Sequence, residues 1–171
     1  VEELRRLPGV KGVVDLPPIR LKLDRAAGLV NAPAAWGVLG NEDAGTGVKI
    51  GILDTGIDQN HPAFQDPLLT PPPGYPKCVP ADCPYTNKKV IVARSYVSML
   101  AEGYTTDPSE TSRPDDLSPR DRVGHGTATA MIAAGRQNSG PGGTITGIAP
   151  KAFLGSYKIF GSPGVNDYTF G

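Results

Sequence analysis

Residues 47–62 read G-V-K-I-G-I-L-D-T-G-I-D-Q-N-H-P, and the first half of this stretch decides the fold. Residues 48–53 form a nearly continuous apolar run, which is typical of a parallel strand buried on both faces. The run ends at Asp54, and the Thr55-Gly56 pair that follows permits a tight turn. Open parallel sheets carry their sites at the carboxyl ends of the strands, so the stretch predicts an α/β fold with a site beside Asp54.

Further strands and helices alternate with this strand along the chain. Apolar runs at 90–93 and 153–160 predict two more strands, and the small residues of 126–136 predict a closely packed helix. A second helix is predicted over 31–39, with Asn31 as its cap. The alternation predicts an open, mostly parallel sheet with helices on both faces, which we expect to be incomplete at the C-terminus.

Composition excludes several classes of protein. Lys and Arg together number 17, as do Asp and Glu, so the formal net charge is zero, whereas nucleic acids and anionic membranes select a basic excess. No run of 18 apolar residues occurs, so no transmembrane helix is predicted. Prolines interrupt residues 65–87, and the polar residues 105–122 are predicted to form a long surface loop.

Two side chains could carry chemistry in such a fold. Asp54 follows a buried strand, where a carboxylate needs a partner to offset its desolvation, although a capping role at a strand end would also explain it. His125 begins the small-residue helix between two glycines and can accept a proton, although it could also be a structural histidine that donates to a nearby carbonyl. Together they predict the orienting acid and general base of a nucleophilic enzyme, while His61 is predicted to be a turn residue.

Three blocks of the sequence resemble a known family. Residues 47–62 and the stretch G-H-G-T-A-T-A-M-I-A-A-G at 124–135 resemble the Asp and His motifs of the subtilisin-like serine proteases, or subtilases. G-I-A-P-K-A at 147–152, which leads into Y-K-I-F-G at 157–161, is similar to the next block of that family. The resemblance implies a subtilisin-like fold and the hydrolysis of peptide bonds by an Asp-His-Ser triad.

The resemblance also implies roles for individual residues. Asp54 would orient and stabilise His125, and His125 would act as the general base. A polypeptide substrate would pair, as an added β-strand, with an extended segment that follows the last predicted strand. The residues assigned in this way to substrate binding are Phe160, Gly161, Ser162, Gly164 and Val165.

The same resemblance divides the chain into two parts. Residues 1–23 look like the end of an inhibitory pro-region, which would then be a partner of the enzyme, although residues 4–14 could instead be a native strand of the catalytic domain. Residues 24–171 look like the N-terminal part of a subtilisin-like peptidase domain with an insert at about 65–122. The resemblance implies secretion, to the extracellular space or the cell envelope.

The sequence departs from the family pattern at the nucleophile. The family places its serine in a Gly-Thr-Ser motif, and no serine of this chain has that context. We therefore expect the N-terminal part of a protease, inactive by itself because acyl transfer needs both a nucleophile and oxyanion donors. We also expect a strand near Phe160 to keep an unpaired edge through which chains self-associate.

No metal or other cofactor is expected. Calcium occurs in the family, but Ala63 and the stretch Arg136-Gln137-Asn138 give it no support here. The spacing of the two histidines and the nearby carboxylates matches no common zinc pattern.

The two cysteines leave two alternatives open. Cys78 and Cys83 are five positions apart, which is neither a C-x2-C metal motif nor a redox pair. In a secreted protein a small-loop disulfide is favoured over two free thiols.

Two other classes of function remain open beside the serine endopeptidase. A non-catalytic binding module or pseudoenzyme could use the same fold without the serine motif. A metal-dependent hydrolase would lose activity to a chelator and resist a serine-directed phosphonate. The endopeptidase is the function that the three blocks favour.

Overall fold

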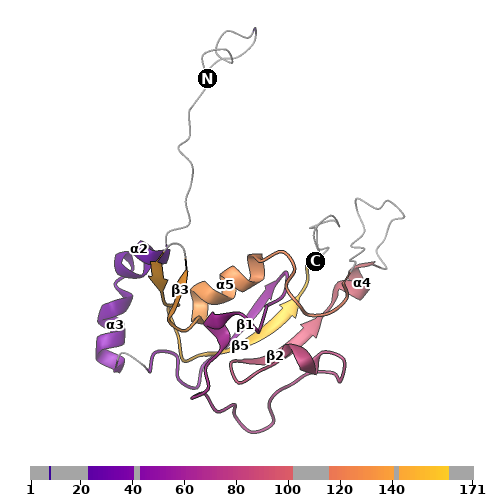
Figure 1. Ribbon diagram of the computed structural model, residues 1–171, viewed down its shortest axis with the longest axis horizontal. Helices are drawn as coiled ribbons and strands as arrows, with labels where there is room; N and C mark the ends of the chain where they lie inside the picture. Colours follow the sequence, from indigo (N-terminus) through magenta and orange to yellow (C-terminus); the bar gives the residue numbers. More distant parts are fainter. Residues whose placement is uncertain (1–7, 9–22, 41–42, 102–115, 141–142, 162–171) are drawn as a thin grey trace.

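The computed structural model describes residues 8, 23–40, 43–101, 116–140 and 143–161, so most of the expected pro-region segment lies outside the described residues (Figure 1). Within the described residues, no helix is long and apolar enough to cross a membrane. In chain order the elements are α2 (Leu23–Leu29), α3 (Ala32–Leu39), β1 (Lys49–Asp54), η1 (Pro62–Phe64), η2 (Cys83–Tyr85), β2 (Val90–Ser95), α4 (Val97–Ala101), α5 (His125–Ala134), β3 (Asn138–Gly140), β4 (Gly143–Ile145) and β5 (Phe153–Lys158).

Three parallel strands form the central sheet in the order β1-β5-β2 (Figure 1). Lys49 of β1 lies opposite Phe153 of β5, and the pairing continues without a shift to Asp54 opposite Lys158. Strands β3 and β4 form a separate antiparallel pair. The predicted α/β fold with an open, mostly parallel sheet is confirmed, and β2 lies inside the range 65–122 that the sequence assigned to an insert.

The expected unpaired edge near Phe160 is wrong. β5 lies in the middle of the sheet and is hydrogen-bonded to a strand on each side, because the chain crosses back after α5 and inserts β5 between β1 and β2. The outer edge of β2 is bridged by Lys77, which pairs with Val92. The outer edge of β1 pairs with no strand among the described residues, so β1 presents the open edge instead.

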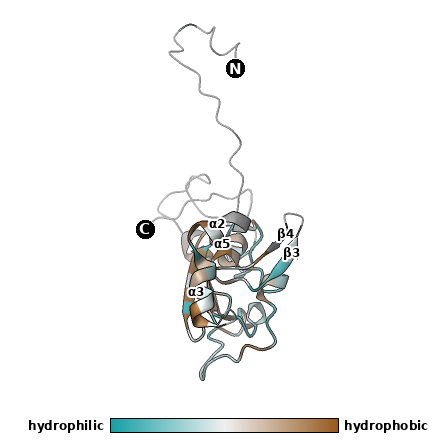
Figure 2. Cartoon of the chain, turned by 90° about the vertical axis from the view of Figure 1, so that its left-hand side faces the viewer, coloured by the Kyte–Doolittle hydropathy of each residue, from teal (hydrophilic) through white to brown (hydrophobic). Residues whose placement is uncertain are grey.

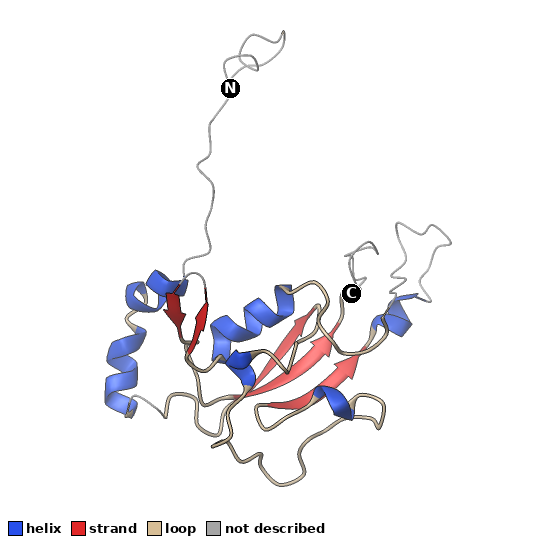
Figure 3. Cartoon of the chain, viewed as in Figure 1, coloured by secondary structure: helices blue, strands red, loops and turns tan. Residues whose placement is uncertain are grey.

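Helix α5 packs on one face of the sheet (Figure 3). Ile52 of β1 and Leu154 of β5 point toward it and meet Ala130, Met131 and Ala134 of the helix. Small side chains on α5 allow its axis to approach the strands closely, and burial of these apolar groups drives the association.

The opposite face of the sheet is covered differently. Leu69, in the loop after η1, packs there against Ile91 and Phe153. The ring of Tyr157 lies over two strand glycines, because an added Cβ at Gly51 or Gly155 would meet its Cε2 at 3.3 or 2.9 Å. Nearby Leu53 keeps 63% of its surface exposed, so this face is only partly covered by the described residues.

Helices α2 and α3 lie beside the sheet rather than on it (Figure 1). The indole Nε1 of Trp36 in α3 donates to the carbonyl of Ile148 at 2.8 Å, which ties the helix to the segment before β5. Asn31 stands at the N-cap position of α3, as predicted, but its side chain makes no capping hydrogen bond. Val38 and Leu39 of α3 are exposed. Figure 2 shows the hydropathy along α3, whose ribbon is partly brown, that is hydrophobic.

Two fully buried lysines connect the loops around the sheet. The Lys89 ammonium donates to the carbonyl oxygens of Pro150 and Ala152, at 2.5 and 2.7 Å. Burial lowers the pKa of Lys89 to about 8, since a charged ammonium loses hydration there. The Lys158 ammonium donates to the carbonyl of Arg120 at 2.9 Å and so holds the segment that leads into α5.

The first turn of α5 touches the turn after β1 backbone to backbone. A Cβ added at Gly126 would overlap the carbonyl oxygen of Gly56 and lie 3.2 Å from the Cβ of Asp54. Gly56 has a φ of 106°, which residues with a side chain rarely adopt. Glycine at 126 permits the two segments to lie this close, whereas glycine at 56 permits the φ of the turn and leaves room for the backbone of residues 119–121.

We predict that Gly126→Ala lowers the free energy of unfolding by at least about 2 kcal/mol, because the added methyl must push the α5 backbone away from Gly56. Denaturant titration of the purified chain measures this. Gly37→Ala in α3 is the matched control: its Cβ would meet nothing within 4 Å. That change should be neutral or raise stability by up to about 1 kcal/mol through helix propensity. Equal effects of the two substitutions would contradict the packing argument.

Candidate active site

Asp54 is the last residue of β1 and is 6% exposed. Its Oδ1 accepts a hydrogen bond from the backbone N–H of Thr55 at 2.7 Å. Its Oδ2 accepts a longer one from the Thr129 hydroxyl, at 3.4 Å, from α5. These partners fix the carboxylate at the carboxyl edge of the sheet, where site residues of parallel sheets lie.

His125 is the first residue of α5, and its ring faces that carboxylate. The ring Nδ1 lies 2.8 Å from Oδ1 and 2.9 Å from Oδ2 of Asp54. The His125 side chain is 72% exposed, whereas the Asp54 side chain is 9% exposed. Within the described part of the chain nothing is hydrogen-bonded to Nε2 of His125, so this nitrogen can exchange a proton with a group that approaches it from solvent.

The structure thus brings together the two residues that the sequence predicted for catalysis. With Nδ1–H donating to Asp54, the ring is held in the tautomer whose Nε2 carries a lone pair. The pair can therefore act as a base with an orienting acid.

The residues predicted for substrate binding are described only in part. Phe160 and Gly161 leave β5 at the same sheet edge as Asp54, whose carbonyl oxygen accepts from the N–H groups of Ile159 at 2.9 Å and Phe160 at 3.4 Å. Ser162, Gly164 and Val165 lie outside the described residues.

His61 lies in a turn of its own, as the sequence predicted. Its Nδ1 accepts from the Ala63 N–H at 3.2 Å and caps η1, and its ring contacts Phe64. Among the described residues no three His, Cys, Asp or Glu side chains gather into a group that could hold a metal ion.

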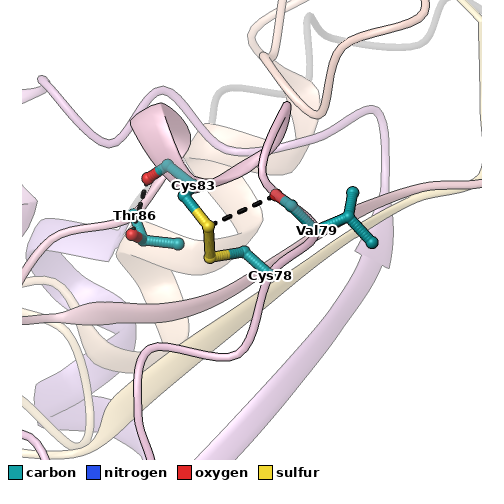
Figure 4. Close-up of a disulfide and its surroundings, with 4 residues drawn as sticks. All are labelled: Cys78, Val79, Cys83 and Thr86. Carbon is teal, nitrogen blue, oxygen red and sulfur yellow. Dashed lines mark hydrogen bonds between the residues drawn. A yellow bond between two sulfur atoms is a disulfide. The ribbon is translucent and has the colours of Figure 1, made fainter.

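Cys78 and Cys83 are joined by a disulfide in the structure (Figure 4). Cys83 begins η2, and its carbonyl accepts from the Thr86 hydroxyl at 2.7 Å. The bridge closes a small loop outside the sheet, so it constrains the Pro-rich segment locally.

One buried carboxylate near the site was missed by sequence reasoning. Asp121 is 7% exposed and lies four positions before His125. Burial alone would raise its pKa, but hydrogen bonds from Thr127, Gly124 and Val123 outweigh burial and hold the pKa below its usual value. The available signal was its position just before a helix N-terminus, where an acidic side chain is favoured.

Comparison with known sequences identifies the family. The Subtilase family profile matches residues 45–170, which is most of the chain and includes the whole sheet and both residues of the pair. The chain therefore belongs to the subtilase family.

Similar sequences among curated proteins include subtilisin-like proteases of a plant. Subtilisin-like protease SBT1.4 of Arabidopsis thaliana is 34% identical over 178 residues, which cover 96% of this chain and 22% of that protein. Subtilisin-like protease SBT2.3 of the same plant is 40% identical over 133 residues, covering 70% of this chain and 15% of that protein. The chain spans about a fifth of the length of SBT1.4.

We predict that Asp54→Asn moves the ring proton of His125 from Nδ1 to Nε2. The Thr55 N–H keeps the amide oxygen at the Oδ1 position, so the amide nitrogen takes the Oδ2 position and donates to Nδ1. Long-range proton–nitrogen NMR of the chain at alkaline pH reports the tautomer. The sequence has two histidines, so His61 is the internal reference and should not change. An unchanged His125 tautomer would refute the orienting role of Asp54.

Proposed function

We propose that this chain belongs to a secreted serine endopeptidase that hydrolyses peptide bonds with an Asp-His-Ser triad. Asp54 and His125 supply the acid and the base, and the nucleophilic serine is supplied by a part of the protein outside these 171 residues. The observation that carries the proposal is the 2.8 Å contact between His125 Nδ1 and the buried Asp54 carboxylate at the carboxyl edge of the sheet. Membership of the subtilase family supports it.

In this mechanism the exposed Nε2 of His125 takes the proton from the serine hydroxyl as the oxygen attacks the scissile carbonyl carbon. The Asp54 carboxylate keeps the ring oriented and stabilises the imidazolium that forms. The imidazolium then gives its proton to the leaving amine, and an acyl-enzyme remains. The same nitrogen then takes a proton from water as the water oxygen attacks the ester carbonyl carbon, and the imidazolium returns this proton to the departing serine oxygen, which restores the hydroxyl.

A polypeptide substrate is proposed to bind along the segment that begins at Phe160 and Gly161 and extends through Ser162, Gly164 and Val165. Backbone hydrogen bonds to an extended segment would hold a peptide strand irrespective of its side chains. Phe160 lies directly beside the Asp54 backbone, so a peptide paired there would be close to the proposed base.

Residues 1–23 are proposed to be the end of an inhibitory pro-region, and the protein to be secreted to the extracellular space or the cell envelope. The Cys78–Cys83 disulfide supports secretion, because such bridges persist in oxidising compartments. We propose no metal or cofactor for the reaction. The isolated chain should be inactive and should self-associate through the open edge of β1.

A binding module or pseudoenzyme on the same fold is the competing proposal. It would bind peptides but leave no covalent adduct with a fluorophosphonate probe. A metal-dependent hydrolase would be inhibited by a chelator and not by the probe. Peptide hydrolysis measured with and without the probe and the chelator, together with labelling by the probe, therefore separates all three classes.

In the natural full-length protein, we predict that His125→Ala lowers kcat by about 10⁴- to 10⁶-fold, the range known for loss of the Asp or His of subtilisin itself, with little change in KM. The base acts in the transition state and contributes little to ground-state binding. Steady-state hydrolysis of a chromogenic peptide measures both constants.

The matched control is His61→Ala, which removes the other histidine and should leave kcat within a few-fold of wild type. The 171-residue chain should hydrolyse no peptide and take up no fluorophosphonate. Stoichiometric labelling of a serine in this chain, or a kcat that survives loss of His125, would refute the proposed function.

A further inference from the structure

Asp121 is a buried carboxylate whose two oxygens are each bonded to fixed backbone donors. Oδ1 accepts from the N–H groups of Val123 at 2.9 Å and Gly124 at 2.8 Å, and from the Thr55 hydroxyl at 2.9 Å. Oδ2 accepts from the N–H of Thr127 at 2.8 Å and from its hydroxyl at 2.5 Å. Five donors converge on one side chain.

These bonds hold the backbone on both sides of His125. Gly124 immediately precedes it and Thr127 lies two residues beyond it in the first turn of α5. Gly126 between them donates its N–H to the Thr55 hydroxyl oxygen at 2.9 Å, and that hydroxyl donates to Asp121. The turn that carries His125 is thus fixed to Asp121 directly and through Thr55.

The same carboxylate reaches the segment that carries Asp54. Thr55, which donates its hydroxyl to Asp121, also donates its backbone N–H to the Asp54 carboxylate. The Thr127 hydroxyl oxygen accepts a hydrogen bond from the Asp58 N–H at 3.0 Å, and the same hydroxyl donates to Asp121. One buried side chain therefore joins the turn after β1 to the start of α5.

We propose that Asp121 is a positioning residue that sets the distance between His125 and Asp54. It bonds the backbone around His125 and not the imidazole ring, so it acts through the α5 turn and through Thr55. The proposal rests on the proposed function for its effect on catalysis, but its effect on the His125 ring is independent of that function.

A carboxylate is required at this position because both of its oxygens receive a backbone N–H. An asparagine has the same shape but must turn its NH₂ group toward one of them. That places two donors against each other in a buried site, and one N–H loses its acceptor. The α5 turn must then move, and a shift of about 1 Å at a catalytic base costs about 100-fold in rate.

The test compares Asp121→Asn with Asp66→Asn. Asp66 is also a buried carboxylate, 6% exposed, and accepts from the Leu68 N–H and the Lys151 ammonium in a region apart from the pair. Both variants lose a buried acceptor, so both should melt at a lower temperature. In the full-length protein, Asp121→Asn should lower kcat by about 10- to 100-fold with KM changed by less than about three-fold, whereas Asp66→Asn should leave kcat within about two-fold.

The second readout is the NMR signal of the His125 ring nitrogens in the 171-residue chain, with His61 as reference. Asp121→Asn should shift the Nδ1 signal of His125, because the bond to Asp54 lengthens, and Asp66→Asn should not. Thr55→Val keeps the carboxylate and removes one of its donors. Thr55→Val should shift the Nδ1 signal of His125 less, in the same direction. If Asp121→Asn does not fold, the Thr55→Val signal tests the positioning role in its place.

Two results would overturn the proposal. One is that Asp121→Asn changes neither kcat nor the His125 signal. The other is that Asp121→Asn and Asp66→Asn change kcat and the His125 signal equally. A wild-type protein without peptidase activity would refute the proposed function alone. In that case the His125 signal still tests the positioning role.

Discussion

The site depends on the close backbone contact of Gly126 in the first turn of α5 with Gly56 in the turn after β1, the two segments that the Asp121 hydrogen bonds also join. Hydrogen bonds at the site have nearly fixed lengths, so His125 and Asp54 can pair only when these two segments lie at the matching distance. The absence of a Cβ at Gly126 lets the helix approach until His125 Nδ1 lies 2.8 Å from the Asp54 carboxylate. Residues far apart in the sequence are joined in this way without a strained side chain.

The elements that follow from local periodicity could be predicted from the sequence. The apolar runs that became β1, β2 and β5 and the small-residue helix α5 were located to within a few residues of their ends. The order of the strands could not be predicted in the same way, because it depends on where each crossover returns to the sheet. For that reason the sequence predicts an open edge near Phe160, whereas among the described residues it is β1 that has the open edge.

The proximity of Asp54 and His125 could be anticipated from two motifs and their residue types, but the support behind them could not. Asp121 lies between two arginines in the sequence, which is an ordinary context for an exposed acid. Its burial arises only when donors from the β1 turn and the α5 turn converge on it. Lys89 is a similar case, since its ammonium is buried by carbonyl groups that lie far along the chain. Such residues are recognised mainly through tertiary contacts, and the local signal for Asp121 is limited to its position just before the N-terminus of α5.

The position of β5 between β1 and β2 has a consequence for how the chain folds during synthesis. Lys49 pairs with Phe153, so β1 is made long before the strand that completes its hydrogen bonds. Until β5 emerges from the ribosome, β1 and β2 have no shared partner and both edges of β1 are open. Pairings of this long range are slow to form and expose edges in the meantime. A chaperone or another folded segment would therefore protect the chain most in the interval between the synthesis of β1 and the synthesis of β5.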